Sequence, residues 1–427
     1  MNAASRKIQR TYLTLLLFNT LAASLIWGIN TLFLLDAGLS NLEAFAANAF
    51  FTAGLVLFEI PTGVIADLRG RRASYLLGSL TLAISTALYL WMWYVSAPFW
   101  AWAVSSAFLG LGFTFFSGAV EAWLVDALTA SGFKGKLESV FAKGQITQGV
   151  TMLTGSVLGG FIAQVTDLGV PYILRAAILV ITFGLAFWLM HDLGFKPDRG
   201  KKPMKEIKTI LAGSMEHGLR NPPVRWVMLA APFTMGVTFY AFYAMQPYLL
   251  ELYGDKEAYG IAGLAAAIVA CAQIAGGLLV PYIGKLFKRR TSVLIAGVIF
   301  STLALATIGL VQNFWLAVSL LVVWGLTFAA VTPVRQAYIN ALIPSKQRAT
   351  VLSFDSLLGS TGGVGIQPVL GKVADAWNYP TSYIVGAAFQ AIALPFTLLA
   401  RREKNGADAI RVEALQPVPV PEKPLQK

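Results

Sequence analysis

The 427-residue chain contains few charged residues, one cysteine and two histidines. Only 13% of its residues are charged, against about 25% in typical soluble domains, whereas 56% are hydrophobic. Its one cysteine, Cys271, excludes a disulfide within the chain. With two histidines, it offers no metal-ligand cluster and no Ser-His-Asp set, and it has no nucleotide-binding P-loop. We therefore expect no cofactor and no enzymatic activity, and ATP is excluded as a direct energy source.

Long apolar runs dominate what the chain does contain. A membrane helix needs roughly 20 mostly apolar residues, and runs of about this length recur along the sequence. The pattern predicts an all-α membrane protein with twelve transmembrane helices. The expected spans are 11–35, 43–67, 73–95, 98–127, 137–165, 171–192, 223–252, 258–284, 291–311, 313–341, 348–375 and 380–400.

The net charge of +12 is distributed unevenly between the expected loops. If the N-terminus is cytoplasmic, 29 of the 33 lysines and arginines lie in cytoplasmic segments, and the opposite loops near 36–43, 96–98 and 312–313 have none. This asymmetry predicts that both termini are cytoplasmic. A nucleic-acid-binding protein would instead cluster basic and aromatic residues on solvated elements. The lipid bilayer is therefore the expected partner, and nucleic acid is not.

A polar, basic stretch near 194–225 divides the spans into six and six. The halves resemble each other, since Gly-Arg-Arg at 70–72 and Lys-Arg-Arg at 288–290 follow corresponding spans about 218 residues apart. Parallel six-helix repeats with a binding site between them are a known plan of secondary transporters. The expected domains are an N-terminal bundle 1–193, a cytoplasmic linker 194–222, a C-terminal bundle 223–402 and a disordered cytoplasmic tail 403–427.

The segment GVIADLRGRR at 63–72 ends the second expected span. It resembles the signature between helices 2 and 3 of the major facilitator superfamily: a glycine, three residues, an aspartate, then a glycine followed by basic residues. Leu68 departs from the pattern, and in a degenerate copy at 281–290 Lys285 replaces the aspartate. The resemblance implies two pseudo-symmetric six-helix bundles that alternate access between the two sides of the membrane.

The resemblance also implies a latch that holds the halves together in the outward-facing state. The aspartate suits the positive N-terminus of the eleventh span, which starts on the same side. The glycines permit close helix approach and a tight turn, and an arginine pairs with a carboxylate at the end of the fourth span. Alternatively, the basic residues are simply solvated. The expected latch residues are Gly63, Asp67, Gly70, Arg71 and Asp126.

Ionisable residues inside expected spans are costly and are therefore candidates for function. A carboxylate in low dielectric can carry a proton near neutral pH, so the proton-coupling candidates are Glu59, Glu121 and Asp355. Arg335, next to Gln336, is a candidate substrate ligand or partner of a carboxylate. The alternative for each is structural pairing or contact with the cytoplasmic surface. Arg175 is expected at the outer edge of the sixth span, as an interface anchor.

In the superfamily, helices 1, 4, 7 and 10 line a central cavity. By position, the resemblance places Trp27, Asn30, Tyr240, Tyr243 and Gln246 on its wall. An aromatic wall with few polar groups suits amphipathic organic molecules. In the fifth span, GSVLGG at 155–160 resembles the glycine-rich motif of the family's antiporters, and close helix packing is the alternative reading of its glycines.

The combined prediction is a secondary active transporter with alternating access that exports a small amphipathic organic compound in exchange for protons. One alternative is a transporter, or importer, of a specific anionic metabolite bound by Arg335. Another is a membrane sensor that does not transport. We expect a monomer in a plasma membrane, with the inner membrane of a bacterium as the first choice and a eukaryotic membrane as the alternative.

Overall fold

A computed structural model describes residues 2–195, 208, 212, 213, 215–344 and 348–410. This part of the chain is helical and holds no strand. The N-terminal half contains α1 Ala3–Trp27, α2 Asn30–Asp36, α3 Asn41–Arg69, α4 Arg71–Tyr94, α5 Phe99–Thr114, α6 Ala119–Ala130, α7 Leu137–Val165 and α8 Gly169–Leu189. The C-terminal half contains α10 Pro222–Tyr253, α11 Tyr259–Leu286, α12 Arg290–Leu310, α13 Phe314–Leu342, α14 Arg348–Ala376, α15 Tyr379–Ala391 and α16 Ala393–Arg402.

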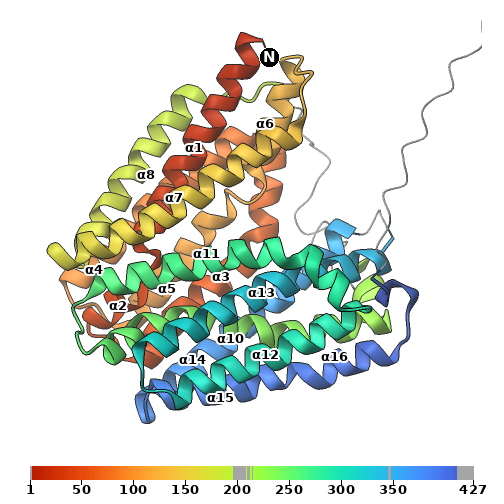
Figure 1. Ribbon diagram of the computed structural model, residues 1–427. Coiled ribbons are helices and arrows are strands. Elements are labelled where there is room, and N and C mark those ends of the chain that lie inside the picture. The colour runs from red at the N-terminus through yellow and green to blue at the C-terminus, as the bar shows by residue number, and fades with distance from the viewer. Residues whose placement is uncertain (1, 196–207, 209–211, 214, 345–347, 411–427) are drawn as a thin grey trace, which may run out of the picture.

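The helices form two six-span bundles (Figure 1). Ten helices of the described chain are long and apolar enough to cross a membrane, and the pair α1–α2, bent by 51°, makes an eleventh. The twelfth span is α14, whose 29 residues include four charged residues and five glycines. It packs between α3 and α10, which shields its polar groups from lipid. The prediction of twelve helices in two bundles is therefore confirmed.

Matching aspartates cap the third membrane-spanning helix of each bundle, which is α4 in the N-terminal half and α12 in the C-terminal half. After α8, Asp192 accepts a hydrogen bond from the backbone N–H of Arg72, the second residue of α4, at 2.9 Å. After α16, Asp408 accepts from the N–H of Thr291, the second residue of α12, at 2.8 Å and from its hydroxyl at 2.9 Å. Residues 403–410 of the predicted disordered tail are therefore ordered against α12, because Asp408 satisfies a free N–H group and a hydroxyl of that helix. The rest of that tail lies outside the described residues.

Removing either cap is expected to lower the stability of the bundle that contains it. Asp192→Ala loses one cap, worth about 1 kcal/mol. Asp408 is only 6% exposed, so Asp408→Ala also leaves buried donors unpaired and is expected to cost up to about 3 kcal/mol. Thermal unfolding of the purified protein measures both, with Glu216→Ala, at an exposed position, as the control. Equal melting temperatures for Asp408→Ala and the control would contradict the assignment.

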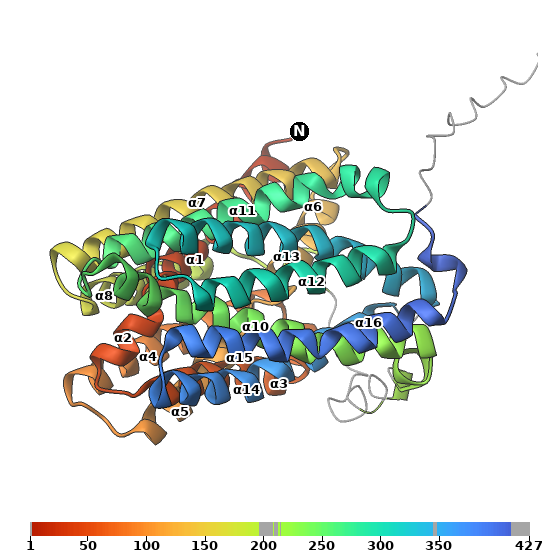
Figure 2. The same cartoon turned by 60° about the horizontal axis from the view of Figure 1, so that its bottom comes forward.

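Contacts between the halves gather at the face formed by the loops 37–40, 95–98, 254–258 and 377–378, called here the closed face. The principal pairs are α3 with α14 and α7 with α11 (Figure 2). Asp375 accepts hydrogen bonds from the first N–H groups of α3, Asn41 at 2.9 Å and Leu42 at 2.8 Å. Gln164 accepts from Gly260 at the start of α11 at 3.0 Å. Each half thus caps a helix of the other.

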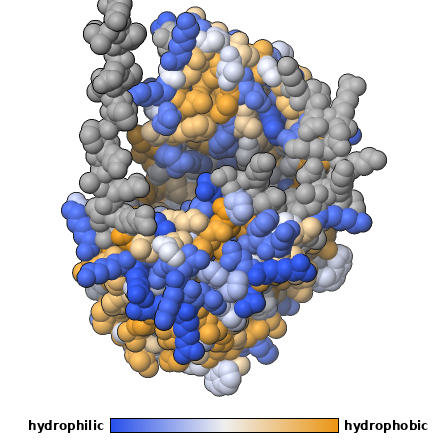
Figure 3. Space-filling model, turned by 90° about the vertical axis from the view of Figure 1, so that its right-hand side faces the viewer, coloured by the Kyte–Doolittle hydropathy of each residue, from blue (hydrophilic) through white to orange (hydrophobic). Residues whose placement is uncertain are grey.

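The opposite end of the molecule, called here the basic face, comprises the start of α1 and the loops after α3, α6 and α11. Figure 1 shows the two bundles diverging toward this end. Viewed from it, hydrophilic side chains gather on both lobes among hydrophobic ones, and the surface is hollowed between the two lobes (Figure 3). The structure is therefore closed on one face and open toward the basic face.

Candidate functional site

A central cavity of about 210 Å³ lies where the halves meet. Seven helices of the N-terminal half line it, and Tyr243 of α10 contributes from the other half. Three of the five residues predicted to face a cavity, Trp27, Asn30 and Tyr243, lie together here. Much of the remaining wall is apolar or aromatic, and Phe51 and Phe113 meet edge to face at 5.5 Å between centroids. The cavity therefore suits a small, largely apolar molecule.

A chain of hydrogen bonds forms the polar side of this cavity. The Tyr172 hydroxyl donates to Asn30 Oδ1 at 3.0 Å, and Asn30 Nδ2 donates to Asn48 Oδ1 at 2.9 Å. Asn48 is 4% exposed, and its Nδ2 has no partner. A buried amide group without a partner is unfavourable unless a ligand or water binds it. Asn48 was not among the predicted site residues, because one asparagine in an apolar run gives no periodic signal.

Arg175 is a second unexpected member of the cavity wall. It was predicted to anchor the outer edge of α8, and this prediction is wrong, since Arg175 is 1% exposed. Its Nε donates to Thr86 Oγ1 at 3.1 Å and its Nη1 to the Ala22 carbonyl at 3.0 Å, whereas Nη2 has no partner. The guanidinium faces the bundle because Thr86 and the Ala22 carbonyl supply acceptors there, which the hydropathy pattern does not show.

Two of the predicted cavity residues have other positions. Tyr240 is buried in the C-terminal bundle and donates its hydroxyl to Ser382 on α15. Gln246 bridges the halves at the break between α1 and α2, where its side chain accepts from Thr31 N–H at 2.9 Å and donates to the Trp27 carbonyl at 3.0 Å. Both backbone groups are freed by the break, so Gln246 satisfies them and is not available as a ligand in this conformation.

A bidentate ion pair lies inside the C-terminal bundle. Arg335 on α13 binds the two carboxylate oxygens of Asp355 on α14 at 2.6 and 2.7 Å, and also donates to the Val227 carbonyl at 3.2 Å. Asp355 is 6% exposed. Together with Gln336, the pair lines a second cavity of about 220 Å³. Of the two roles considered for Arg335, the geometry favours partner of a carboxylate.

The other two candidate carboxylates have more polar surroundings. Glu59 on α3 is half-buried and accepts a hydrogen bond from the Ser117 hydroxyl at 2.6 Å, at the break between α5 and α6. Glu121 is exposed in the first turn of α6, where a carboxylate complements the helix dipole. Neither is enclosed as Asp355 is, so their coupling roles stay predictions.

At the loop between α3 and α4, Arg71 pairs with Asp67 of its own segment at 2.6 Å. Among the described residues Asp126 forms no ion pair, and Asp192 is the carboxylate that binds this loop, so the expected pairing of Arg71 with Asp126 is absent here. Gly70 has φ +103°, and an added Cβ would collide with the Asp192 carboxylate. The tight turn predicted at Gly70 is present, whereas Gly63 has no close neighbour at the position of a Cβ.

The glycines of the 155–160 segment lie in close helix contacts. Added Cβ atoms at Gly155 and Gly159 would collide with Ser24 and Leu25 of α1. At Gly160 the Cβ would lie 2.6 Å from the Tyr259 carbonyl oxygen, at the start of α11 in the other half. Close packing accounts for all three glycines.

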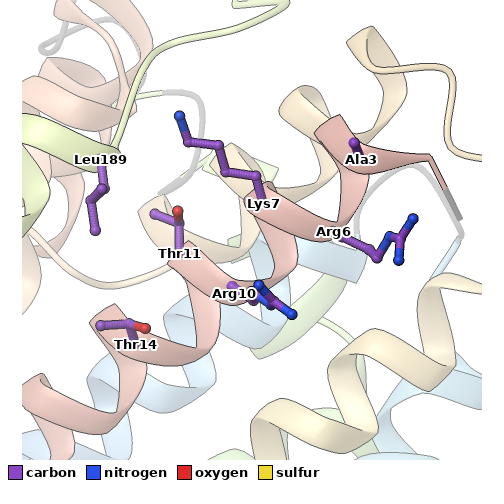
Figure 4. A pocket seen from close by; sticks show the side chains of 7 residues that line it. All are labelled: Ala3, Arg6, Lys7, Arg10, Thr11, Thr14 and Leu189. Atoms are coloured by element: carbon purple, nitrogen blue, oxygen red, sulfur yellow. The ribbon is translucent and has the colours of Figure 1, made fainter.

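A further hollow of about 390 Å³ lies at the basic face, along the start of α1. Arg6, Lys7 and Arg10 line it, and all three are exposed. In Figure 4 their side chains spread apart and converge on no common point. This arrangement suits contact with water or lipid headgroups, so the cavity lined by Asn30 and the cavity lined by Arg335 are the candidate sites.

Two six-helix membrane bundles that meet at one face and diverge at the other, with a cavity where they meet, are the architecture of a membrane transporter. A sequence model of the Major Facilitator Superfamily matches residues 12–285 and 256–425. The chain therefore belongs to the Major Facilitator Superfamily and is a multi-pass integral membrane protein.

Curated relatives and solved structures agree with this family. The chain is 24% identical over 409 residues to the multidrug resistance protein MdtG of Dickeya zeae, covering 92% of this chain and 94% of the relative. It is 26% identical to MdtG of Salmonella dublin, covering 74% of each. Its fold is similar to the nucleoside transporter NupG, with TM-score 0.78, 12% identity, and 93% and 99% of the two chains covered. A bacterial homolog of the human lysosomal transporter Spinster gives TM-score 0.71 at 15% identity, with 94% and 98% covered.

Proposed function

We propose that this chain is a proton-coupled exporter of a small amphipathic organic compound. Two relatives similar over most of their length are named multidrug resistance proteins. The aromatic central cavity has a size and lining suited to such a compound. In this proposal the protein is a monomer in a prokaryotic inner membrane, the basic face is cytoplasmic, and the compound enters the cavity from that face.

The proposed proton coupling rests on the ion pair between Arg335 and Asp355 inside the C-terminal bundle. Of the three candidate carboxylates, only Asp355 is buried, and it links α13 to α14 through two charge-assisted hydrogen bonds. Transfer of a proton from water to Asp355 removes its charge and weakens the link, and release of the proton restores it. In this proposal the paired state follows release of the proton toward the basic face, where the two lobes diverge, and the compound then binds from that face.

The loop between α3 and α4 is proposed to act in the other conformation. Here the halves diverge at the basic face, and Asp67 and Arg71 pair within one segment. When the basic face closes, α3 and the start of α14 approach each other. Asp67 can then face the N-terminus of α14, as the latch requires.

Proteoliposomes with an acidic interior and an internal pH dye provide the test. We expect that an added substrate enters as protons leave, and that a protonophore abolishes the accumulation. A panel of lipophilic cations and organic anions identifies the compound class, with protein-free liposomes as the control. Uptake that is insensitive to the pH gradient, or that moves protons in the same direction as the substrate, would overturn the exporter proposal.

A further inference from the structure

The Arg175 guanidinium is a buried positive charge without an anionic partner. No carboxylate among the described residues pairs with it, and its hydrogen bonds go to a neutral hydroxyl and a backbone carbonyl. The Phe113 ring, 5.8 Å from Cζ, supplies only a weak cation–π contact. A charge buried inside a membrane bundle is costly unless it is paired. Nη2 has no acceptor among the described residues, and the residue that carries it lines the cavity, so an acceptor from outside the protein would satisfy it.

Asn48 supplies a second free donor in the same cavity. The Tyr172 hydroxyl donates to Asn30 Oδ1, which turns Asn30 Nδ2 toward Asn48 Oδ1. This leaves Asn48 Nδ2 as the free end of the chain, and it is buried without a partner. Two side chains on α3 and α8 thus line the same cavity, and each has one buried donor nitrogen without a partner.

The rest of the wall selects the other features of a ligand. No aspartate or glutamate is among the described residues that line this cavity, so an organic cation finds no counter-charge. A dry cavity of about 150 Å³ accepts benzene, and the 210 Å³ here leaves room for one ring and a small polar group. Trp27, Phe113 and Tyr243 supply aromatic surface for such a ring.

We propose that this cavity binds a small organic anion, a single aromatic ring carrying a carboxylate, whose oxygens accept from Arg175 Nη2 and Asn48 Nδ2. The proposal rests on the proposed function only in taking this molecule as the transported compound. It assigns substrate recognition to Arg175, in the N-terminal half, and leaves Arg335 to its pair with Asp355.

Equilibrium binding to the purified protein, without any pH gradient, tests the site. The probes are benzoate, the neutral benzamide and the cationic benzylamine. We expect benzoate to bind at least about tenfold more tightly than benzamide, since a hydrogen bond to a charged group contributes about 1.5–3 kcal/mol. Benzylamine should not bind measurably.

Two variants separate the site from folding. Arg175→Met removes the charge, and Asn48→Asp places a carboxylate in the wall of the same cavity. Both should reduce benzoate binding at least about tenfold, whereas Asn48→Asp should also raise the melting temperature by supplying the missing anion. The exposed Arg220→Gln is the matched control and should bind benzoate as wild type does.

Benzoate binding that is unchanged in both variants, or tighter binding of benzylamine than of benzoate, would overturn the proposal. These outcomes are distinct from failure of the proposed function. If benzoate binds through Arg175 but no proton exchange occurs in proteoliposomes, the anion site is supported and the proposal of a proton-coupled exporter is wrong. If lipophilic cations exchange for protons and benzoate does not bind, the exporter proposal is supported and the proposal of an anion site is wrong.

Discussion

Replacing Gly263 by leucine is expected to abolish transport and to leave the closed face open. Gly263 lies on α11 where α1 and α7 meet it. An added Cβ would lie 2.5 Å from the Ser156 carbonyl oxygen, and a Cβ on Gly28 would lie 2.8 Å from Gly263 Cα. Because these neighbours are backbone atoms, only separation of the helices relieves the overlap. A steric penalty of about 3 kcal/mol on the conformation with this face closed shifts the ratio of closed to open conformations about 100-fold.

A cysteine reporter measures this change directly. In a Cys271→Ser background, Met152→Cys places one thiol in the central cavity. A membrane-impermeant maleimide added at the closed face should label it slowly in the otherwise wild-type protein and rapidly in Gly263→Leu. Gly277→Leu is the matched control, since it lies on the same helix with no atom within 4 Å of its added Cβ. If Gly263→Leu transports normally and its reporter stays protected, the closed face does not depend on this contact.

The fold was largely predictable because it depends on features that are local in the sequence, namely the length of apolar runs and the charge of the loops between them. Apolar length placed most spans, and the alternation of basic loops supported α14, whose charges and glycines weaken its hydropathy signal. The breaks between α1 and α2 and between α5 and α6 were not predicted. The first break is stabilised by Gln246, more than 200 residues away in sequence, so no local pattern reveals it.

The central cavity was only partly predictable because helical position does not fix which neighbour a side chain meets. Tyr240 and Tyr243 are one turn apart on α10, and an offset of about 60° around the helix axis separates them. That offset is enough to direct Tyr240 to Ser382 of α15, whereas Tyr243 lines the cavity. The surroundings of Arg175 come from α1, α4 and α5, which only the assembled bundle brings together.

Asp355→Asn is expected to reduce the rate of transport driven by a pH gradient about 100-fold or more, if the charged link between Asp355 and Arg335 contributes about 3 kcal/mol. Asparagine has nearly the same shape and still accepts a hydrogen bond from Arg335, but it cannot bind and release a proton. Transport of the same compound down its own gradient should persist. In the same assay Glu121→Gln and Glu59→Gln should retain most of their gradient-driven transport, because their carboxylates are exposed or half-buried and bonded to neutral groups.

Loss of activity in Asp355→Asn alone has a second explanation, since an unpaired Arg335 in the bundle would itself be destabilising by about 3–5 kcal/mol if fully buried. Arg335 is 23% exposed in its side chain, so the penalty is smaller, and a double variant removes it. Asp355→Asn with Arg335→Gln replaces the ion pair by two neutral amides that can still bond to each other. We expect it to recover the wild-type melting temperature without recovering coupling. If the double variant regains coupled transport, the proton is carried elsewhere. A selective loss in Glu121→Gln would then assign it to the start of α6.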